Sequence, residues 1–396
     1  MLRTLKQLKN LKGKRVLLRV DFNVPLEKGK VADDTRIKGT LPTIKFLLRK
    51  KAKVIIMSHL GRPDGKHVSG LTLDVVGRCL QKLLGRKVQK LHDCIGASVE
   101  KAVLKMEDGQ VVLLENVRFH AEEEACEPGF TKTLASLGEV FVNDAFGTSH
   151  RKHASTAGIA KYLPSYGGFL IEREIKALEP LLHKPKKPVV LLVGGAKITT
   201  KIGLIKNFFG KADSILIGGA LANTFLKAEG YDIGKSLYEP AKTEVARELL
   251  MLAEKKRQKI ILPEDAIVAD TIGEDAQTLD LPLEDIEGDM KILDIGSRTQ
   301  RHFMKIMNSA RTVIWNGPMG LYEFTPFAWG TRNLARSLAL LEKTTVQSFI
   351  GGGDTIDALN RCGISLKKFT FISTGGGAML EYLEGKKLPG IEVLQA

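Results

Sequence analysis

A run of three glycines near the end of the chain, at residues 375–377, is suited to bind a phosphate group. It follows a short apolar run, 369–372, and precedes a segment, 378–383, whose apolar residues recur at helical spacing. Glycines between a strand and a helix let backbone N–H groups approach an anion, and the helix start adds unpaired donors and a positive dipole end. Taken alone, the pattern fits a phosphate cradle and a simple chain reversal equally well.

In the first half of the chain, arginines occur singly, in or near polar segments that follow apolar runs. A guanidinium binds oxyanions through two parallel hydrogen bonds, so arginines from separate loops are suited to converge on one phosphate or carboxylate. With a histidine, and an Asp-x-Asn pair that is placed to hold a substrate hydroxyl, the candidates are Asp21, Asn23, Arg36, His59, Arg62, Arg118 and Arg151. A surface salt bridge explains any one arginine more simply, and an interior position explains His59 equally well, but the set as a whole favours an anion site.

In the second half, the corresponding segments are rich in glycine and carry few charged or amide residues. These residues are Lys197, Lys201, Asn316, Glu323 and Asp354. Backbone donors with a lysine suit a polyphosphate, and one carboxylate suits Mg²⁺, which takes few protein ligands beside phosphate oxygens and water. We expect Asp354 to contact the metal, although Gly-Asp-Thr before an apolar segment is also a helix-capping pattern.

Several common catalytic motifs are missing from the chain. It contains neither Gly-x-x-x-x-Gly-Lys-[Ser/Thr] nor Gly-x-Gly-x-x-Gly, which disfavours a P-loop NTPase and a nicotinamide-dependent enzyme. It also lacks the Gly-x-Ser-x-Gly elbow of many hydrolases and the His-Arg-Asp loop of protein kinases. A phosphate-binding protein of another kind is therefore expected.

One architectural unit positions all of these residues: a short apolar run, a polar or glycine-rich segment, and then an amphipathic helix. The runs are 15–20, 54–57, 111–114, 141–142, 189–193, 215–217, 259–262, 312–315, 348–350 and 369–372. Continuous apolar strands separated by helices predict parallel sheets that are covered on both faces. Ligands of such sheets bind beyond the carboxyl ends of the strands, and nearly every candidate residue falls there.

Length and composition restrict the remaining possibilities. The chain has 396 residues, which suggests two domains, and the proline- and lysine-rich segment 184–188 is the expected break. The net charge of +15 predicts attraction to polyanions such as nucleic acid, acidic membranes or phosphorylated metabolites. Four cysteines lie far apart and show no zinc-finger spacing with histidine, which predicts free thiols in a reducing compartment. With no secretory signal and no apolar stretch of spanning length, we expect a cytoplasmic location.

One half built for a small anion and the other for a nucleotide predict phosphoryl transfer across a cleft between them. Such chemistry depends on in-line placement of the reacting groups and on neutralisation of charge on the migrating phosphoryl group, more than on covalent catalysis by the protein. It also depends on exclusion of water, so we expect the two domains to close on their substrates.

The motifs also resemble those of a known family, in order along nearly the whole chain. They are Arg19-Val-Asp-Phe-Asn-Val-Pro25, Ser58-His-Leu-Gly-Arg-Pro63, Glu115-Asn-Val-Arg-Phe119, Asn143-Asp-Ala-Phe-Gly-Thr148, Gly194-Gly-Ala-Lys197, Trp315-Asn-Gly-Pro318, Gly351-Gly-Gly-Asp354 and Ser373-Thr-Gly-Gly-Gly377. Together they are similar to the motifs of phosphoglycerate kinases. The chain departs from that family at Ala220 and Leu221, where glycine and methionine are usual, so the family's adenine contacts are not carried over there.

The resemblance implies an α/β fold of two Rossmann-like domains, each a parallel sheet covered by helices on both faces, with an active-site cleft between them. It implies a 3-phosphoglycerate-binding domain over 1–170 with a returning tail at 381–396, an interdomain helix and linker at 171–188, and a nucleotide-binding domain over 189–380. The implied reaction is reversible phosphoryl transfer between 1,3-bisphosphoglycerate and Mg-ADP, giving 3-phosphoglycerate and Mg-ATP. The implied protein is a cytoplasmic monomer of glycolysis.

The resemblance also implies a role for each candidate residue. The seven residues of the anion site would bind 3-phosphoglycerate. The nucleotide would lie on Gly195, Lys197, Lys201, Gly219, Asn316, Pro318, Glu323, Gly352, Gly353, Asp354, Thr355 and Gly377. Asp354 would meet Mg²⁺, and the groups that stabilise the transferring phosphoryl would be Arg36, Lys201, Gly375 and Gly376.

Two alternatives remain at this point. The net charge suggests a nucleic-acid-binding protein, but the basic residues are dispersed, aromatic residues make up only 6% and no recognition motif is present. The second alternative is another ATP-dependent carboxylate or acyl-phosphate kinase. We expect small-molecule substrates, with no specific nucleic acid and no membrane as partners.

Overall fold

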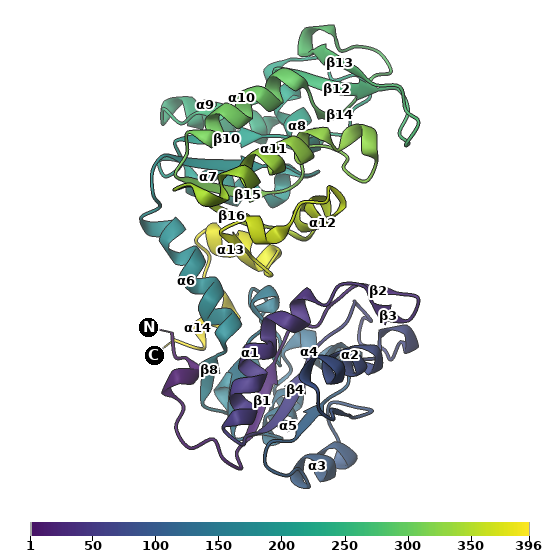
Figure 1. Cartoon of the computed structure of the whole chain (residues 1–396), viewed down its shortest axis with the longest axis vertical. Coiled ribbons are helices and arrows are strands. Elements are labelled where there is room, and N and C mark those ends of the chain that lie inside the picture. The colour runs from purple at the N-terminus through teal and green to yellow at the C-terminus, as the bar shows by residue number, and fades with distance from the viewer. Residues whose placement is uncertain (1, 396) are drawn as a thin grey trace. The chain divides into compact units, whose positions relative to one another are not determined.

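The computed structural model of the chain describes residues 2–395 and divides into two compact units (Figure 1). Unit 1 comprises the chain up to Leu178 and again from Lys387 onward, and unit 2 runs from Glu179 to Lys386. Each unit is built on a six-stranded sheet with helices packed against it. The chain therefore forms one contiguous unit inserted into a discontinuous one.

The sheet of unit 1 is parallel throughout. Its strands are, in spatial order, β5 (Gln89–Lys90), β6 (Val111–Leu113), β4 (Lys53–Met57), β1 (Arg15–Arg19), β7 (Val140–Asn143) and β8 (Ser165–Gly167). The predicted strands of this half are present, whereas the short edge strands β5 and β8 were not predicted. Strand β1 lies at the centre, with Val16 opposite both Val54 and Val140.

Alternate residues of β1 face two separate cores, which explains why helices cover both faces. Val16 and Leu18 belong to a core formed with α1 (Thr35–Arg49) and α2 (Asp74–Leu84). Leu17 belongs to the opposite core, formed with α3 (Ala97–Leu104) and α5 (Pro128–Ser136). Three smaller elements complete this part: the hairpin of β2 (Leu26–Glu27) and β3 (Lys30–Val31), and α4 (Ala121–Ala125).

The sheet of unit 2 is also parallel. Its spatial order is β11 (Ile260–Ile261), β10 (Ser214–Ile217), β9 (Val189–Val193), β15 (Thr312–Asn316), β16 (Gln347–Gly351) and β17 (Phe371–Ile372). Numbered along the chain this is 3-2-1-4-5-6, the doubly wound order, whose direction reverses between β9 and β15. The helices of this unit are α7 (Ile202–Phe208), α8 (Gly219–Glu229), α9 (Thr243–Lys255), α10 (Ser297–Asn308), α11 (Trp329–Leu340), α12 (Gly353–Arg361) and α13 (Gly377–Leu383).

A second, antiparallel sheet in unit 2 was not predicted from the sequence. It pairs β12 (Asp265–Ala269) with β13 (Leu279–Pro282) on one side and β14 (Lys291–Ile295) on the other (Figure 1). Ala266 and Val268 pack with Leu226 of α8 in a small core of their own. This sheet extends unit 2 beyond the doubly wound pattern.

Two segments of unit 1 are fixed to the carboxyl end of β7 by adjacent residues. The Asn143 amide donates to the Gly390 carbonyl at 3.0 Å, within the C-terminal segment that contains α14 (Pro389–Glu392). The Asp144 carboxylate accepts from the backbone N–H groups of Leu170 and Ile171, at the start of α6 (Phe169–His183). Leu388, Ile391 and Leu394 of the C-terminal segment are buried. None of the described helices has the length and apolar character needed to cross a membrane.

We predict that Leu394→Ala destabilises unit 1 by about 2–5 kcal/mol, because it removes a completely buried side chain and leaves a cavity. The measurement is urea unfolding followed by two signals. Both tryptophans, Trp315 and Trp329, lie in unit 2, so their fluorescence reports that unit, while far-ultraviolet circular dichroism reports both.

In Leu394→Ala the dichroism transition should move to lower urea while the fluorescence transition stays in place. The matched control is Gln395→Ala, at the neighbouring exposed position, which should shift neither transition. Equal transitions for Leu394→Ala and the control would contradict a role for this segment in the core.

Candidate active site

The predicted anion-site residues of unit 1 project from one edge of its sheet. They follow the carboxyl ends of β1, β4, β6 and β7, which are neighbours and parallel. Asp21 and Asn23 follow β1, His59 and Arg62 follow β4, and Arg118 and Arg151 follow β6 and β7. Arg36 is the second residue of α1. The sheet therefore brings together loops that are up to 130 residues apart in sequence.

Two of these loops are joined by the Asp-x-Asn pair. The Asp21 carboxylate forms an ion pair with Arg36 at 2.8 Å and accepts from the Asn23 N–H at 3.2 Å. The Asn23 side-chain carbonyl accepts from the Gly61 N–H at 2.9 Å. Asp21 is buried, while the side chain of Arg36 is 34% exposed. One face of the Arg36 guanidinium is thus held by the protein and the rest can meet a ligand.

Arg118 is a buried cation within this cluster. Its Nη1 donates to the Gly61 carbonyl at 3.0 Å, and its Nε lies 2.9 Å from a Glu124 carboxylate oxygen. Burial lowers the pKa of the Arg118 guanidinium, and the positive charge of Arg151 lowers it further against the opposing effect of Glu124. Two cations that repel each other in a partly desolvated site are stabilised when an anion binds between them.

His59 is neutral, and its tautomer follows from its partner. Burial lowers the pKa of His59 well below its usual value, and the charges of Arg19 and Arg118 lower it further. Its Nδ1 lies 3.2 Å from Nη2 of Arg19. Because a guanidinium can only donate, Nδ1 must accept and the proton must be on Nε2. His59 therefore offers a neutral N–H donor beside the cationic cluster.

Arg62 and Arg151 are exposed. Arg151 acts electrostatically on Arg118, so it belongs to the cluster. Within residues 2–395, no hydrogen bond or ion pair connects Arg62 to the other predicted residues. Arg62 is placed near the site only by its position directly after Gly61.

A buried polar network beneath the cluster was missed by the sequence analysis. Arg19 is completely buried, and its Nε donates to the Ser155 hydroxyl at 2.8 Å while another nitrogen bonds the Val20 carbonyl. The Ser155 hydroxyl donates to Glu123 at 2.5 Å, and the Ser155 N–H donates to the same carboxylate at 2.9 Å. Burial raises the pKa of Glu123, whereas the charge of Arg19 opposes that shift. Arg19 thereby fixes the His59 ring.

In unit 2, glycines allow three loops to meet where the strand order reverses. Gly194 N–H donates to the Asn316 carbonyl at 2.9 Å, and Gly195 N–H to the Pro318 carbonyl at 2.8 Å. A side chain on Gly194 would lie 2.2 Å from the Pro318 carbonyl, and one on Gly317 would lie 2.2 Å from the Gly194 carbonyl. Packing between the loops therefore requires glycine at both positions, whatever ligand binds.

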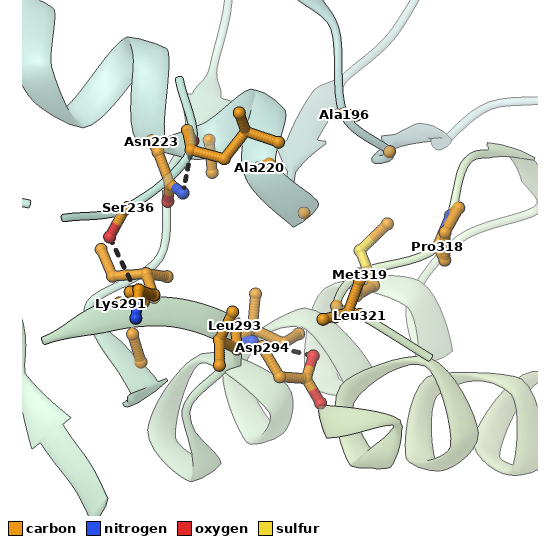
Figure 2. A pocket seen from close by; sticks show the side chains of 18 of the residues that line it. Ala196, Ala220, Asn223, Ser236, Lys291, Leu293, Asp294, Pro318, Met319 and Leu321 are labelled. Carbon is orange, nitrogen blue, oxygen red and sulfur yellow. Dashed lines mark hydrogen bonds between the residues drawn. The ribbon is translucent and has the colours of Figure 1, made fainter. Parts of the chain in front are cut away.

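A cavity of about 700 Å³ opens beside this junction. Figure 2 shows the side chains of Leu293, Met319 and Leu321 along its wall, with Ala196 and Ala220 on the opposite side. Five of the predicted nucleotide-binding residues line it. They are Gly195, Gly219, Pro318, Glu323 and Asp354. A mostly apolar cavity with a few polar side chains in its lining suits a nucleoside.

The cavity also uses residues that the sequence analysis did not identify. Leu293 and Asp294 come from β14 of the unpredicted antiparallel sheet, and Lys235 and Ser236 precede α9. The β-branched residues of β14 were a sequence signal for Leu293 and Asp294, whereas Lys235 and Ser236 had none. Two positions differ from the residues that are usual in the family the sequence resembles. Of these, Ala220 lines the cavity, whereas Leu221 is buried in α8.

The remaining predicted residues lie outside this cavity, beyond β9, β15, β16 and β17. They are Lys197, Lys201, Asn316, Gly352, Gly353, Thr355, Gly375, Gly376 and Gly377. Several of them bind each other. Lys201 Nζ is hydrogen-bonded to the Asn316 side-chain carbonyl, whose amide donates to the Gly351 carbonyl at 2.8 Å. The Thr355 hydroxyl donates to the same carbonyl at 2.9 Å and accepts from the Gly317 N–H at 2.7 Å.

The Asp354 carboxylate is exposed and could hold a metal ion. It is exposed in the first turn of α12 and lines the cavity, and no hydrogen bond or ion pair engages its carboxylate within residues 2–395. Gly352 is the N-cap residue of α12, so the capping alternative for Asp354 is wrong. A single free carboxylate in the cavity lining fits the preference of Mg²⁺ for few protein ligands.

The glycine run at 375–377 is a tight turn into α13. Gly376 has φ +45°, a conformation that favours glycine, and α13 begins at Gly377. The Gly375 N–H donates to the Ser373 hydroxyl at 3.1 Å. In this conformation the Gly375 N–H is already hydrogen-bonded within the protein. A phosphate that binds to this N–H must therefore displace the Ser373 hydroxyl.

Comparison with known proteins identifies the family. The sequence profile of the family described as phosphoglycerate kinase matches residues 5–386. The phosphoglycerate kinases of Dictyoglomus turgidum and Pelotomaculum thermopropionicum are each 51% identical to this chain; the matches cover 98% and 97% of it, and 96% and 97% of the relatives. The solved phosphoglycerate kinase structure from Coxiella burnetii has a TM-score of 0.87 and 41% identity, and covers 100% of this chain and 99% of its own.

The chain belongs to the phosphoglycerate kinase family. The structure of the family member from Pyrococcus horikoshii, at 34% identity, gives a TM-score of 0.86 over 100% of this chain and 98% of its own. The predicted family, the α/β fold class and the assignment to glycolytic kinases are confirmed. A nucleic-acid-binding function is not favoured.

Lys201 has a lowered pKa. Burial lowers its pKa from 10.5 to about 8, although the carboxylates of Asp354 and Glu384 oppose the shift. At this pKa, roughly nine-tenths of the free protein carries the charge at pH 7 and roughly one-tenth at pH 9. Above pH 8 Lys201 is mostly uncharged in the free protein, so a polyphosphate bound beside it would raise its protonation.

We predict that polyphosphate binding weakens by up to about tenfold between pH 7 and pH 9, because the free protein must first protonate Lys201 at the higher pH. The measurement is the Kd of ATP by calorimetry across this range. The control is Lys201→Arg, whose guanidinium keeps its charge, so any titration of ATP itself appears in both proteins. The same pH slope in both would remove Lys201 as the cause.

Proposed function

We propose that this chain catalyses reversible phosphoryl transfer between 1,3-bisphosphoglycerate and Mg-ADP, giving 3-phosphoglycerate and Mg-ATP. The observation that carries the proposal is that the two units offer different kinds of binding site. Unit 1 holds an arginine cluster with a neutral histidine donor, and unit 2 holds a nucleoside-sized cavity lined by Asp354, with Lys201 outside that cavity. The named activity of the relatives supports the same reaction.

In this proposal 3-phosphoglycerate binds to unit 1. The cationic pair of Arg118 and Arg151 suits its phosphate, and the His59 Nε2–H suits a phosphate or carboxylate oxygen. Asn23 and the Asp21 carboxylate suit its hydroxyl. Arg62 extends the cluster toward solvent.

The nucleotide binds to unit 2, with its base against the apolar wall formed by Leu293 and Met319. Its phosphates pass Gly195 and Gly219 toward Lys201 and the glycine turn. Mg²⁺ would be held by Asp354, where it supplies charge neutralisation on the phosphate oxygens. Lys197, Asn316, Pro318, Glu323 and the loop at 352–355 complete this side, with Gly377 at the start of α13.

The chemistry requires no general base from the protein. In the direction of ATP use, the acceptor is the carboxylate of 3-phosphoglycerate, which is already ionised at neutral pH. Its oxygen forms a bond to the γ-phosphorus as the bond to the leaving oxygen of ADP breaks. Arg36, Lys201 and the amides at 375–376 neutralise the charge that spreads over the transferring group.

Both substrates must come within bonding distance, so we propose that the two units close when both are bound. Solution scattering measures such closure as a smaller radius of gyration with both substrates than with either alone. We further propose that the enzyme works as a cytoplasmic monomer with small-molecule substrates only, without nucleic acid or membrane.

A coupled assay with ATP, Mg²⁺ and 3-phosphoglycerate tests the function directly. Turnover with 3-phosphoglycerate, and none with acetate or glutamate as the acceptor, is expected. Preference for acetate or glutamate would favour another carboxylate kinase. Absent turnover with steeply salt-dependent binding of random DNA would favour a nucleic-acid-binding protein.

We predict that Arg36→Ala lowers kcat at least about 100-fold, because it removes a guanidinium aimed at the transferring group. The melting temperature should change little, since the side chain is partly exposed and Asp21 keeps its bond from Asn23. The matched control is Lys38→Ala, two residues further along α1, where an exposed lysine forms an ion pair with Asp34. Comparable turnover in the two variants would remove Arg36 from the mechanism.

A further inference from the structure

A cluster of Asp93, Cys94 and His120 in unit 1 lies outside the proposed active site. Asp93 and Cys94 lie in the loop between β5 and α3, and His120 is the N-cap residue of α4 after β6. Strands β5 and β6 are neighbours, so the sheet brings these two loops together. One carboxylate oxygen, the Cys94 Sγ and one imidazole nitrogen all lie within 4.8 Å of one another.

The three side chains are held in place by surrounding groups. The Asp93 carboxylate lies 2.7 Å from His120 Nε2 and accepts from the Cys94 N–H at 2.6 Å. The His120 ring packs on Phe130, with ring centres 5.3 Å apart. Cys94 is buried, whereas the Asp93 and His120 side chains are 48% and 25% exposed. The cluster therefore has a closed apolar side and an open side that solvent ions can reach.

The donor set selects a particular class of cation. Thiolate, imidazole and carboxylate together suit Zn²⁺ and similar borderline-soft divalent ions, whereas Mg²⁺ prefers oxygen ligands in octahedral geometry. Tetrahedral zinc ligands at 2.0–2.3 Å lie about 3.3 to 3.8 Å from each other. The 2.7 Å pair would open slightly and the sulfur would move inward, which the exposed Asp93 and His120 can accommodate by rotation.

The local charges also favour a cation. The carboxylates of Asp93 and Glu123 both act electrostatically on the Cys94 sulfur, and Glu123 is completely buried. Nearby carboxylates favour a divalent cation, because the ion adds two positive charges when the thiol releases one proton to water.

We propose that Asp93, Cys94 and His120 form a binding site for Zn²⁺ or a chemically similar thiophilic divalent cation. Binding replaces the S–H bond of Cys94 by a sulfur–metal bond and breaks the hydrogen bond between Asp93 and His120. Three protein ligands leave a fourth position for water. The site is separate from the Mg²⁺ position proposed at Asp354, which belongs to unit 2.

The test is a titration of the metal-depleted chain with Co²⁺, which substitutes for Zn²⁺ and gives a thiolate-to-metal absorption band. One equivalent should produce the band, and Zn²⁺ should abolish it by displacement. Cys94→Ser should lose the band completely, whereas Cys79→Ser and Cys126→Ser, which alter half-buried thiols of the same unit, should keep it. No band, or a band that survives in Cys94→Ser, would overturn the proposal.

A second variant keeps the thiol and covers the case in which Cys94→Ser does not fold. His120→Gln should weaken Co²⁺ binding at least about tenfold, as loss of a ligand does. Phosphoryl transfer by both variants in the absence of Co²⁺ should equal that of the parent, which shows that they are folded. Unchanged Co²⁺ affinity in a fully active His120→Gln would remove the histidine and overturn the three-residue site.

Discussion

Parallel strand pairing is the constraint on which both units depend. In each sheet the carboxyl ends of neighbouring strands meet at one edge, so loops that are distant in sequence are forced together. In unit 1 this edge collects Asp21, His59 and Arg118, and further along it Asp93 with His120. In unit 2 it collects the glycine loops around Gly195 and Pro318. A single rule of backbone geometry therefore places the residues of the proposed anion site, the proposed nucleotide cavity and the proposed zinc site.

Buried charge gives the anion site its fixed geometry. Arg19 and Glu123 are both completely buried and are bridged by the Ser155 hydroxyl. Removing one member of such a pair typically costs about 3–5 kcal/mol, because the other charge is left uncompensated. The arrangement leaves Arg19 no freedom to move, and it fixes His59 as a neutral donor. The exposed arginines can then adapt to a ligand around a rigid centre.

The sequence was informative wherever one physical signal dominated. Continuous apolar runs such as 189–193 predicted the parallel strands, because strands covered on both faces have no polar side. The antiparallel strand β12 was missed because its five residues follow closely on the predicted apolar run 259–262, from which only Pro263 and Glu264 separate them. Glu123 looked like its neighbours in an acidic helix, and only the fold shows that it faces inward. Cys94 and His120 lie 26 residues apart, which no zinc spacing rule covers.

The discontinuity of unit 1 has a consequence for how the chain is made. Residues 179–386 form one contiguous stretch that holds every strand of its own sheets, so unit 2 needs no residues from elsewhere in the chain to complete them. The N-terminal part of unit 1 is synthesised first, but its core is complete only when the segment after residue 386 has been added, because Leu388, Ile391 and Leu394 are buried in it. Unit 2 can thus complete its core before unit 1 does. This reverses the usual order, in which the N-terminal domain folds first during synthesis.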